Sequence, residues 1–196
     1  FDVYAEGAYL NKASNPYYTL DTDFVEFGDL ANFFTAENPD GPIFQASAGL
    51  NLTFGWLLNR SATVGAEYFY NQLGYDSAAV YPVLILNGAY QPFYLGKHYA
   101  ALYLTFEGPD KGNHTTYTLS FLANLSDMSM TGRLDFRWEF LTYLTFEAFV
   151  SGRLGTSGGE FNFALNTPAV FYNSSPIPAI DIPQTLFDLG LALRSR

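Results

Sequence analysis

The chain has 196 residues, enough for one domain of ordinary size spanning 1–196. Charged residues make up only 14% of it and aromatic residues 18%, whereas roughly 25% of residues are charged in a typical soluble domain. A net charge of -10 without a basic patch argues against nucleic acid as a partner. No apolar run reaches the length of a transmembrane helix, about 18 residues. We also expect no cofactor.

Eight segments combine strand-forming residues with a period of two, and each is predicted to be a β-strand. In chain order they are Phe1 to Leu10, Phe44 to Leu58, Ala62 to Leu73, His98 to Glu107, Thr115 to Leu125, Met128 to Phe140, Thr142 to Leu154, and Leu186 to Arg194. Most have about the 9 to 11 residues with which a tilted strand crosses a bilayer. All ten prolines fall in the predicted connections, where no ladder hydrogen bond is lost.

The predicted connections alternate in length along the chain. Long loops follow the first, third and seventh strands, at 11–43, 74–97 and 155–185, whereas the second, fourth and sixth strands end in short turns. Only the fifth connection, Ser126 and Asp127, is short where a long one is expected. This asymmetry is typical of the extracellular and periplasmic ends of outer-membrane barrels.

The second and sixth predicted strands show the alternation most clearly. From Ala46 to Leu58 the even positions carry only Ala, Leu, Phe and Trp, while the odd positions carry mainly Ser, Gly, Asn and Thr. From Met130 to Phe140 the even positions are apolar or glycine, and the odd positions are Thr, Arg, Asp, Arg and Glu. A soluble sheet with its charged face in water shows the same pattern, so one strand alone leaves both alternatives open.

Every charged residue within the eight predicted strands falls on the polar side of its strand. These residues are Asp2, Glu6, Glu67, Glu107, Arg133, Asp135, Arg137, Glu139, Glu147, Arg153, Asp188 and Arg194. An Arg or Lys on the lipid side of a barrel costs roughly 2 to 4 kcal/mol at the bilayer midplane. The segregation therefore predicts an all-β fold, an antiparallel up-and-down transmembrane β-barrel of about eight strands. Closure is expected because hydrocarbon does not tolerate open sheet edges.

Aromatic residues cluster beside the short turns of this predicted barrel. Trp56, Trp138, Phe140 and Tyr143 lie within two or three residues of a tight turn. An amphipathic ring at that position would sit at the headgroup level, as in the aromatic girdles of membrane barrels. Ordinary core aromatics are the alternative interpretation.

The twelve charged residues allow two interpretations of the lumen. The interior of an eight-stranded barrel is just wide enough for side chains to fill it, which favours a packed network of salt bridges. The other interpretation is a charged constriction in a water-filled passage. Eight carboxylates against four arginines would then favour cations.

Residues 17–27 (YYTLDTDFVEF) fit neither a crossing strand nor an ordinary loop. Asp21 and Asp23 fall on one side of this segment and Glu26 on the other, so neither side could meet lipid. We expect a strand above the membrane or part of the first loop, with a short helix over Leu30 to Phe34. The acidic residues of this loop match no calcium-loop spacing, so we expect a solvated loop and no metal site.

Catalysis on lipids is a distant alternative. His98, Asp76 and Ser77 are the residues from which a triad could be assembled, but no spacing in the sequence enforces it. We therefore expect that the protein is not an enzyme.

Through the alternation, the loop asymmetry and the aromatic girdles, the chain resembles bacterial outer-membrane β-barrels, most closely the small eight-stranded barrels of the OmpA, OmpX and OmpW type. The resemblance is architectural and covers nearly the whole sequence. It implies an integral protein of the Gram-negative outer membrane that contacts outer-membrane lipid and lipopolysaccharide, with candidate extracellular ligands at loops 11–43, 74–97 and 155–185. The expected role is structural or loop-mediated interaction, and the alternative is a porin-like passive channel for small solutes.

One departure from this class concerns the C-terminus. Its members usually end in a strand whose last residue is aromatic, whereas this sequence ends Leu193-Arg194-Ser195-Arg196. The sequence also opens directly in a strand, with no signal peptide visible. These features suggest a trimmed chain or a segment of a larger barrel.

Overall fold

The computed structural model describes residues 1–12, 16–20, 34–56, 60–109, 114–167, 170–172, 175–177 and 179–195. Eight strands form one antiparallel sheet in the order β1-β4-β5-β6-β7-β8-β9-β14. They are β1 (Asp2–Lys12), β4 (Asp40–Trp56), β5 (Arg60–Asn71), β6 (His98–Glu107), β7 (Thr115–Asn124), β8 (Ser129–Leu141), β9 (Leu144–Gly155) and β14 (Phe187–Ser195). The all-β antiparallel prediction and all eight predicted strands are confirmed, and only β4 begins as much as four residues earlier than predicted.

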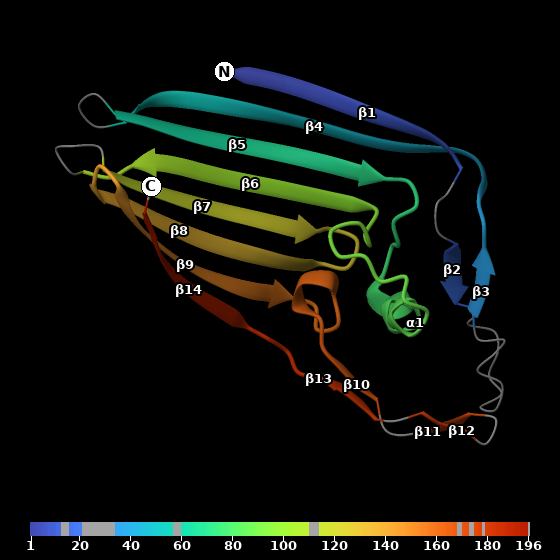
Figure 1. Cartoon of the computed structure of the whole chain (residues 1–196). Coiled ribbons are helices and arrows are strands. Elements are labelled where there is room, and N and C mark those ends of the chain that lie inside the picture. The colour runs from blue at the N-terminus through green and yellow to red at the C-terminus, as the bar shows by residue number, and fades with distance from the viewer. Residues whose placement is uncertain are drawn as a thin grey trace.

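The sheet is fanned, with β1 and β14 at its two edges (Figure 1). Both chain termini lie at the end of the sheet that carries the β4–β5, β6–β7 and β8–β9 connections, while α1, the small hairpins and the short β7–β8 turn lie at the other end (Figure 1). This separation of long and short connections agrees with the prediction from the sequence.

The prediction that every proline lies in a connection is wrong for Pro42, whereas Pro176 lies in the connection between β9 and β14, as predicted. Pro42 lies in β4, near the register shift at which Leu10 pairs with Ile43 and Lys12 with Asp40. Proline is tolerated there because residues 40–44 of β4 extend beyond its ladder with β5, which starts at Gln45, so this part of β4 has one neighbour. Pro176 lies in the short strand β12 (Ser175–Ile177).

The long connections contain small elements of their own. The first holds the hairpin of β2 (Tyr17–Leu20) and β3 (Phe34–Glu37), and the second holds η1 (Ala78–Val80) and α1 (Tyr81–Leu86). The third holds η2 (Glu160–Asn162) and two hairpins, in which β10 (Leu165–Thr167) pairs with β13 (Ile180–Ile182) and β11 (Val170–Tyr172) pairs with β12.

The ambiguous segment 17–27 is thus a strand in its first four residues, and it belongs to a two-stranded sheet separate from the large one. Phe34 begins β3 and does not end a helix. Residues 21–33, with most of the acidic cluster and the rest of the predicted helix, lie outside the described residues.

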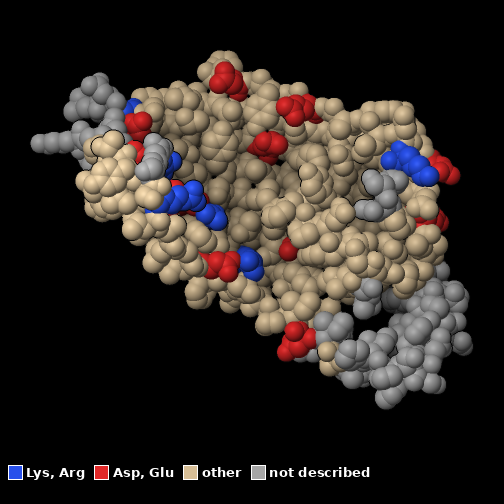
Figure 2. Space-filling view, in the orientation of Figure 1, with Lys and Arg blue, Asp and Glu red and all other residues tan. Residues whose placement is uncertain are grey.

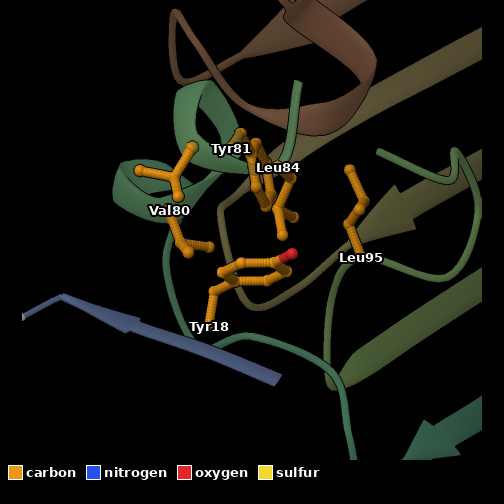
Figure 3. Packing of buried hydrophobic residues seen from close by; sticks show 6 residues of the cluster. Tyr18, Val80, Tyr81, Leu84 and Leu95 are labelled. Carbon is orange, nitrogen blue, oxygen red and sulfur yellow. The ribbon is translucent and has the colours of Figure 1, made fainter. Parts of the chain in front are cut away.

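The three long connections share one apolar core. Its buried members are Tyr18, Val80, Tyr81, Val83, Leu84 and Leu95, with Phe34 and Phe163 packed against them. Figure 3 shows the side chains from η1, α1 and β2 pointing toward one another. Because these residues come from all three long connections, the loops form a single packed unit, which we call the loop cap.

None of the helices in the described part of the chain has both the length and the apolar character needed to cross a membrane.

We predict that Leu84→Ala loosens the loop cap without unfolding the sheet. Leu84 is only 2% exposed, and truncating such a leucine costs about 2 to 5 kcal/mol. Limited proteolysis should cut the 74–97 loop much faster in this variant, with the strand CD signal unchanged. Leu125→Ala, at a residue that is 44% exposed, is the matched control and should leave cleavage nearly unchanged. Equal cleavage of the two variants would contradict the shared core.

Candidate functional site

The strand registers place all twelve predicted lumen charges on one face of the sheet. One row of paired residues runs Asp2, Asn51, Gly65, Tyr103, Ser120, Arg133, Ser151 and Asp188. Antiparallel partners share a face, and so do residues an even number apart on one strand. The other nine charged residues are an even number of positions from the row member on their own strand. We call this side of the sheet the charged face.

One residue departs from the rule that strand charges avoid the apolar face. Arg60 begins β5 and by alternation lies on the side of Ala62 and Val64. It occupies the end of the strand beside the short turn, where its guanidinium donates a hydrogen bond to the carbonyl of Gly108. A charge at this end of a crossing strand lies away from the bilayer midplane, where its cost would be greatest.

The charged face is hollowed (Figure 2). A cavity of about 480 Å³ lies over β8, β9 and β14, where it is lined by Arg133, Asp135, Arg137, Glu147 and Arg194, among others. A second cavity of about 360 Å³ lies nearer the loop cap, between Glu67, Phe69 and Tyr94. Both cavities are on the charged side of the sheet.

Each of the four arginines of the charged face has a carboxylate partner. The pairs are Arg133 with Asp135 at 2.6 Å, Arg137 with Glu139 at 2.6 Å, Arg153 with Asp188 at 2.8 Å, and Arg194 with Glu147 at 3.0 Å. Every side chain in these pairs is between 30% and 70% exposed. The arrangement is an ion-pair ladder along β8, β9 and β14, and in this open sheet the ladder faces solvent.

The half of the charged face that β1, β5 and β6 form is acidic. Asp2, Glu6, Glu67 and Glu107 come from β1, β5 and β6, and within the described ranges none of these four carboxylates has an arginine or lysine partner. Glu67 accepts a hydrogen bond of 2.8 Å from the Tyr4 hydroxyl. Charge is therefore unevenly distributed, with all four arginines on one half of the sheet.

Three aromatic rings lie flat against the charged face, each over a glycine of the neighbouring strand. Tyr4 covers its partner Gly49, Tyr103 covers Gly65, and Phe149 covers Gly190, and a Cβ at any of these glycines would collide with the ring. Tyr103 also donates to Asn51 Oδ1 at 2.6 Å, and the Arg133 guanidinium lies 3.9 Å above the Phe149 ring. The rings cover the sheet surface and do not project from it.

The apolar face carries a continuous row of aromatic contacts near the short turns. Ring contacts link Trp56 to Phe106, Phe106 to Tyr117, Tyr117 to Phe136, Phe136 to Phe146, and Trp138 to Phe140, with centroid separations of 5.2 to 6.3 Å. All four predicted interface aromatics are at least 37% exposed, and Tyr143 is 58% exposed. Strand register adds Phe106, Tyr117, Phe136 and Phe146 to the predicted interface aromatics of this row.

A second group of rings lies toward the loop cap. Tyr9 packs edge-on against Phe44, and His98 contacts both Tyr68 and Tyr70. On β6 the two groups are represented by His98 and Phe106, which bound a stretch of nine residues. That length is within the 9 to 11 residues that a tilted strand needs to cross a bilayer.

A buried polar network holds the loop cap to the end of the sheet. Asn124 donates to Asp127 Oδ2 at 3.1 Å and to Glu160 Oε2 at 2.8 Å. The Tyr81 hydroxyl donates to Asp127 Oδ2 at 2.8 Å, and the Tyr99 hydroxyl donates to Glu160 Oε2 at 2.6 Å. The Glu160 N–H also donates to Asp127 Oδ2, at 2.7 Å. The network therefore joins α1, β6, β7, the β7–β8 turn and η2.

The network contains two carboxylates and no cation among the residues that the structure describes. Burial raises the pKa of Glu160, and the hydrogen bonds from Tyr99, the Phe93 N–H and Asn124 only partly oppose the rise. Burial of the Tyr90 hydroxyl, together with the nearby charges of Glu160 and Asp127, raises the pKa of Tyr90 to about 12. Glu160 therefore binds a proton more readily here than in an unfolded chain.

No sequence motif pointed to Asn124, Asp127 or Glu160, because hydrogen-bond partners far apart in the chain leave no local pattern. The structure also explains the short fifth connection, because Asp127 and Ser126 are docking points. Ser126 Oγ accepts the N–H groups of Lys97 and His98 at 2.9 and 3.1 Å. A longer loop here would displace the cap from the sheet.

The residues of the candidate triad are engaged elsewhere. Asp76 forms an ion pair with Lys97 at 2.6 Å, and His98 Nδ1 is hydrogen-bonded to the Tyr68 hydroxyl. In the described ranges no hydrogen bond joins Asp76, Ser77 and His98, and no group of three or more His, Cys, Asp or Glu residues could hold a metal ion.

Compared with known proteins, the chain matches no family model, no curated protein and no solved structure.

We predict that Gly65→Ala destabilises the sheet by about 1 to 3 kcal/mol, the usual cost of overpacking. The new methyl group would displace the Tyr103 ring and break its hydrogen bond to Asn51. Urea unfolding in detergent measures the change. Gly55→Ala is the matched control, since Gly55 is on the same face and nothing lies within 4 Å of its added Cβ. Similar losses in the two variants would show that the ring does not need the glycine.

We predict that the loop cap is docked most firmly in acid. The raised pKa of Glu160 stabilises the docked state fully below the unfolded value of about 4.3, and this contribution is lost as pH rises through the folded pKa. Amide hydrogen exchange of residues 158–163, corrected for the intrinsic rate, should show protection falling from about pH 4 to pH 7.

Glu160→Gln should remove this pH dependence, whereas Glu37→Gln, at an exposed position of β3, should retain it. Protection that increases with pH in the unmodified protein would contradict the role of Glu160 in docking the loop cap.

Proposed function

We propose that the chain forms a transmembrane β-barrel of a bacterial outer membrane, with its apolar face toward lipid and its charged face toward the lumen. The observation that carries this proposal is the strict division of the sheet. All twelve predicted lumen charges lie on one face, while large apolar side chains such as Leu102 and Leu134 stay 54% and 40% exposed on the other. Exposed apolar surface this extensive requires a partner, and the two groups of rings match the spacing of a bilayer.

The proposed primary role is structural or interactive, through the loop cap. The long connections share a core and a buried network, so they present one ordered surface beyond the end of the strands. An ordered surface loses less conformational entropy on binding than three separate flexible loops would. In this proposal the outer-membrane lipids contact the apolar face, and extracellular ligands contact the cap.

Passive passage of small solutes is the second candidate function, and one observation favours it. The four ion pairs of the charged face are partly exposed and join residues of the same strand or of neighbouring strands among β8, β9 and β14, and three aromatic rings lie over glycines of adjacent strands. Side chains that filled the interior would instead project toward one another. The carboxylates on β1, β5 and β6 have no arginine or lysine partner among the described residues, and they would make such a passage favour cations.

Nitroxide labelling tests the orientation of the two faces. The chain has no cysteine, so single cysteines can be introduced at Leu102 on the apolar face and Thr118 on the charged face. In proteoliposomes the label at 102 should be relaxed by oxygen and the label at 118 by an aqueous nickel chelate. The reverse result, or a protein that stays monodisperse without detergent, would overturn the proposed barrel.

Planar-bilayer recording tests the channel role. Arg137→Leu leaves Glu139 without its partner and adds one net negative charge to the charged face, so cation selectivity should increase. Arg137→Lys retains the charge and should keep the selectivity of the unmodified protein. A silent protein that still passes the labelling test would leave the structural role and exclude the channel.

A further inference from the structure

Both edge strands of the sheet are long, regular and without proline. Soluble proteins protect such edges with prolines, bulges or short strands. β14 pairs with β9 over nine consecutive residues without a bulge, and β1 pairs with β4 without a bulge from Asp2 to Leu10. In the proposed bilayer setting each of these edges must be hydrogen-bonded to another strand, because hydrocarbon offers no other partner.

The charges on the two edges are complementary in sign and in spacing. On the charged face β1 carries Asp2, Glu6 and Lys12, and β14 carries Asp188 and Arg194. Glu6 and Lys12 are six residues apart, and so are Asp188 and Arg194. Because these two spacings are equal, one antiparallel alignment can bring both Glu6 and Lys12 opposite a residue of the other sign. The partners are then Glu6 with Arg194 and Lys12 with Asp188.

We propose that β1 and β14 of one chain pair with each other in this register, and that the sheet thereby closes into an eight-stranded barrel. The inference rests on the proposed transmembrane location and adds a specific register to it. Neighbouring registers that keep the two faces aligned are poorer. Within Asp2–Lys12 of β1 and Phe187–Ser195 of β14, moving β14 by two residues in either direction leaves no opposite charges paired, and a shift that brings Glu6 opposite Asp188 places like charges together.

The strand tilt that this register implies lies within the range found in closed β-barrels. The row of paired residues that starts at Asp2 ends at Asp188 after crossing the whole sheet. In the proposed register Asp188 pairs with Lys12, so one circuit of the eight strands climbs ten residues. With about 3.3 Å per residue and about 4.8 Å between strands, the strands tilt by roughly 40° from the barrel axis, inside the usual range of 35–45°.

The four charged residues of the proposed register are available to form ion pairs between β1 and β14. Within the described residues Glu6 and Lys12 form no ion pair, so closure would supply their partners. Arg194 is 70% exposed even though it already contacts Glu147, and it has room for a second carboxylate. Asp188 would likewise join Lys12 to Arg153.

Disulfide cross-linking tests the register. Ala8 and Ala192 lie directly opposite each other in it, and both are small residues of the charged face. Directly opposite residues have Cα atoms 4.5 to 5.5 Å apart, within the 4.4 to 6.8 Å that a disulfide requires. Oxidation of the Ala8→Cys/Ala192→Cys protein in proteoliposomes should give an intramolecular disulfide about tenfold faster than the off-register control Leu10→Cys/Ala192→Cys.

A second pair in the same register, Glu6→Cys with Arg194→Cys, keeps the test decisive if the first variant fails to fold. A disulfide-linked dimer would show that the edges pair between two copies and would overturn self-closure. Faster linkage in the off-register control would overturn the register, and no linkage in any variant would overturn the pairing of these edges. The labels at 102 and 118 distinguish these failures from failure of the proposed membrane location.

Discussion

Backbone hydrogen bonding along the strands is the constraint on which the rest of the structure depends. A continuous ladder from β1 to β14 fixes the register of every strand, and the register in turn fixes which side chains share a face. A slip of one residue in any strand would carry its charges to the apolar side. The ladder shifts register near one end of β1 and of β8 and stops at the two edge strands. In the proposed membrane location these two edges are the backbone groups that still need hydrogen-bond partners.

Within the charged face, polar and aromatic side chains are arranged to satisfy one another close to the backbone. Each arginine meets a carboxylate on its own strand or the next one, and three rings rest on glycines of adjacent strands. Exposed pairs of this kind contribute little stability individually. Their effect in the proposed barrel is to hold charge along the wall, which leaves the hollow over β8, β9 and β14 open to water.

The loop cap depends on a different balance. Its apolar core joins three connections, and the network around Asn124, Asp127 and Glu160 joins that core to the sheet. In the described part of the chain these two buried carboxylates have no cation beside them. They are tolerated because neutral donors surround them and because one of them, Glu160, takes up a proton more readily than usual. Protonation of Glu160 therefore favours the docked cap, whereas the backbone hydrogen bonds that hold the sheet do not titrate.

The sequence by itself determined the strands, because a period of two is a local property of the chain and each face has a distinct chemical composition. It placed all eight strands and assigned Arg133, Arg137 and their partners to one side. Only the tertiary structure decided which carboxylate each arginine meets and that Tyr103 lies over Gly65. It also decided that Asp127 and Glu160 both accept hydrogen bonds from the side-chain amide of Asn124. These contacts join residues up to 47 positions apart, as in the pair of Glu147 and Arg194, and the alternation of each strand is the same whichever partners its register supplies. The cap escaped prediction for the same reason, since its core is assembled from loops whose local patterns are irregular.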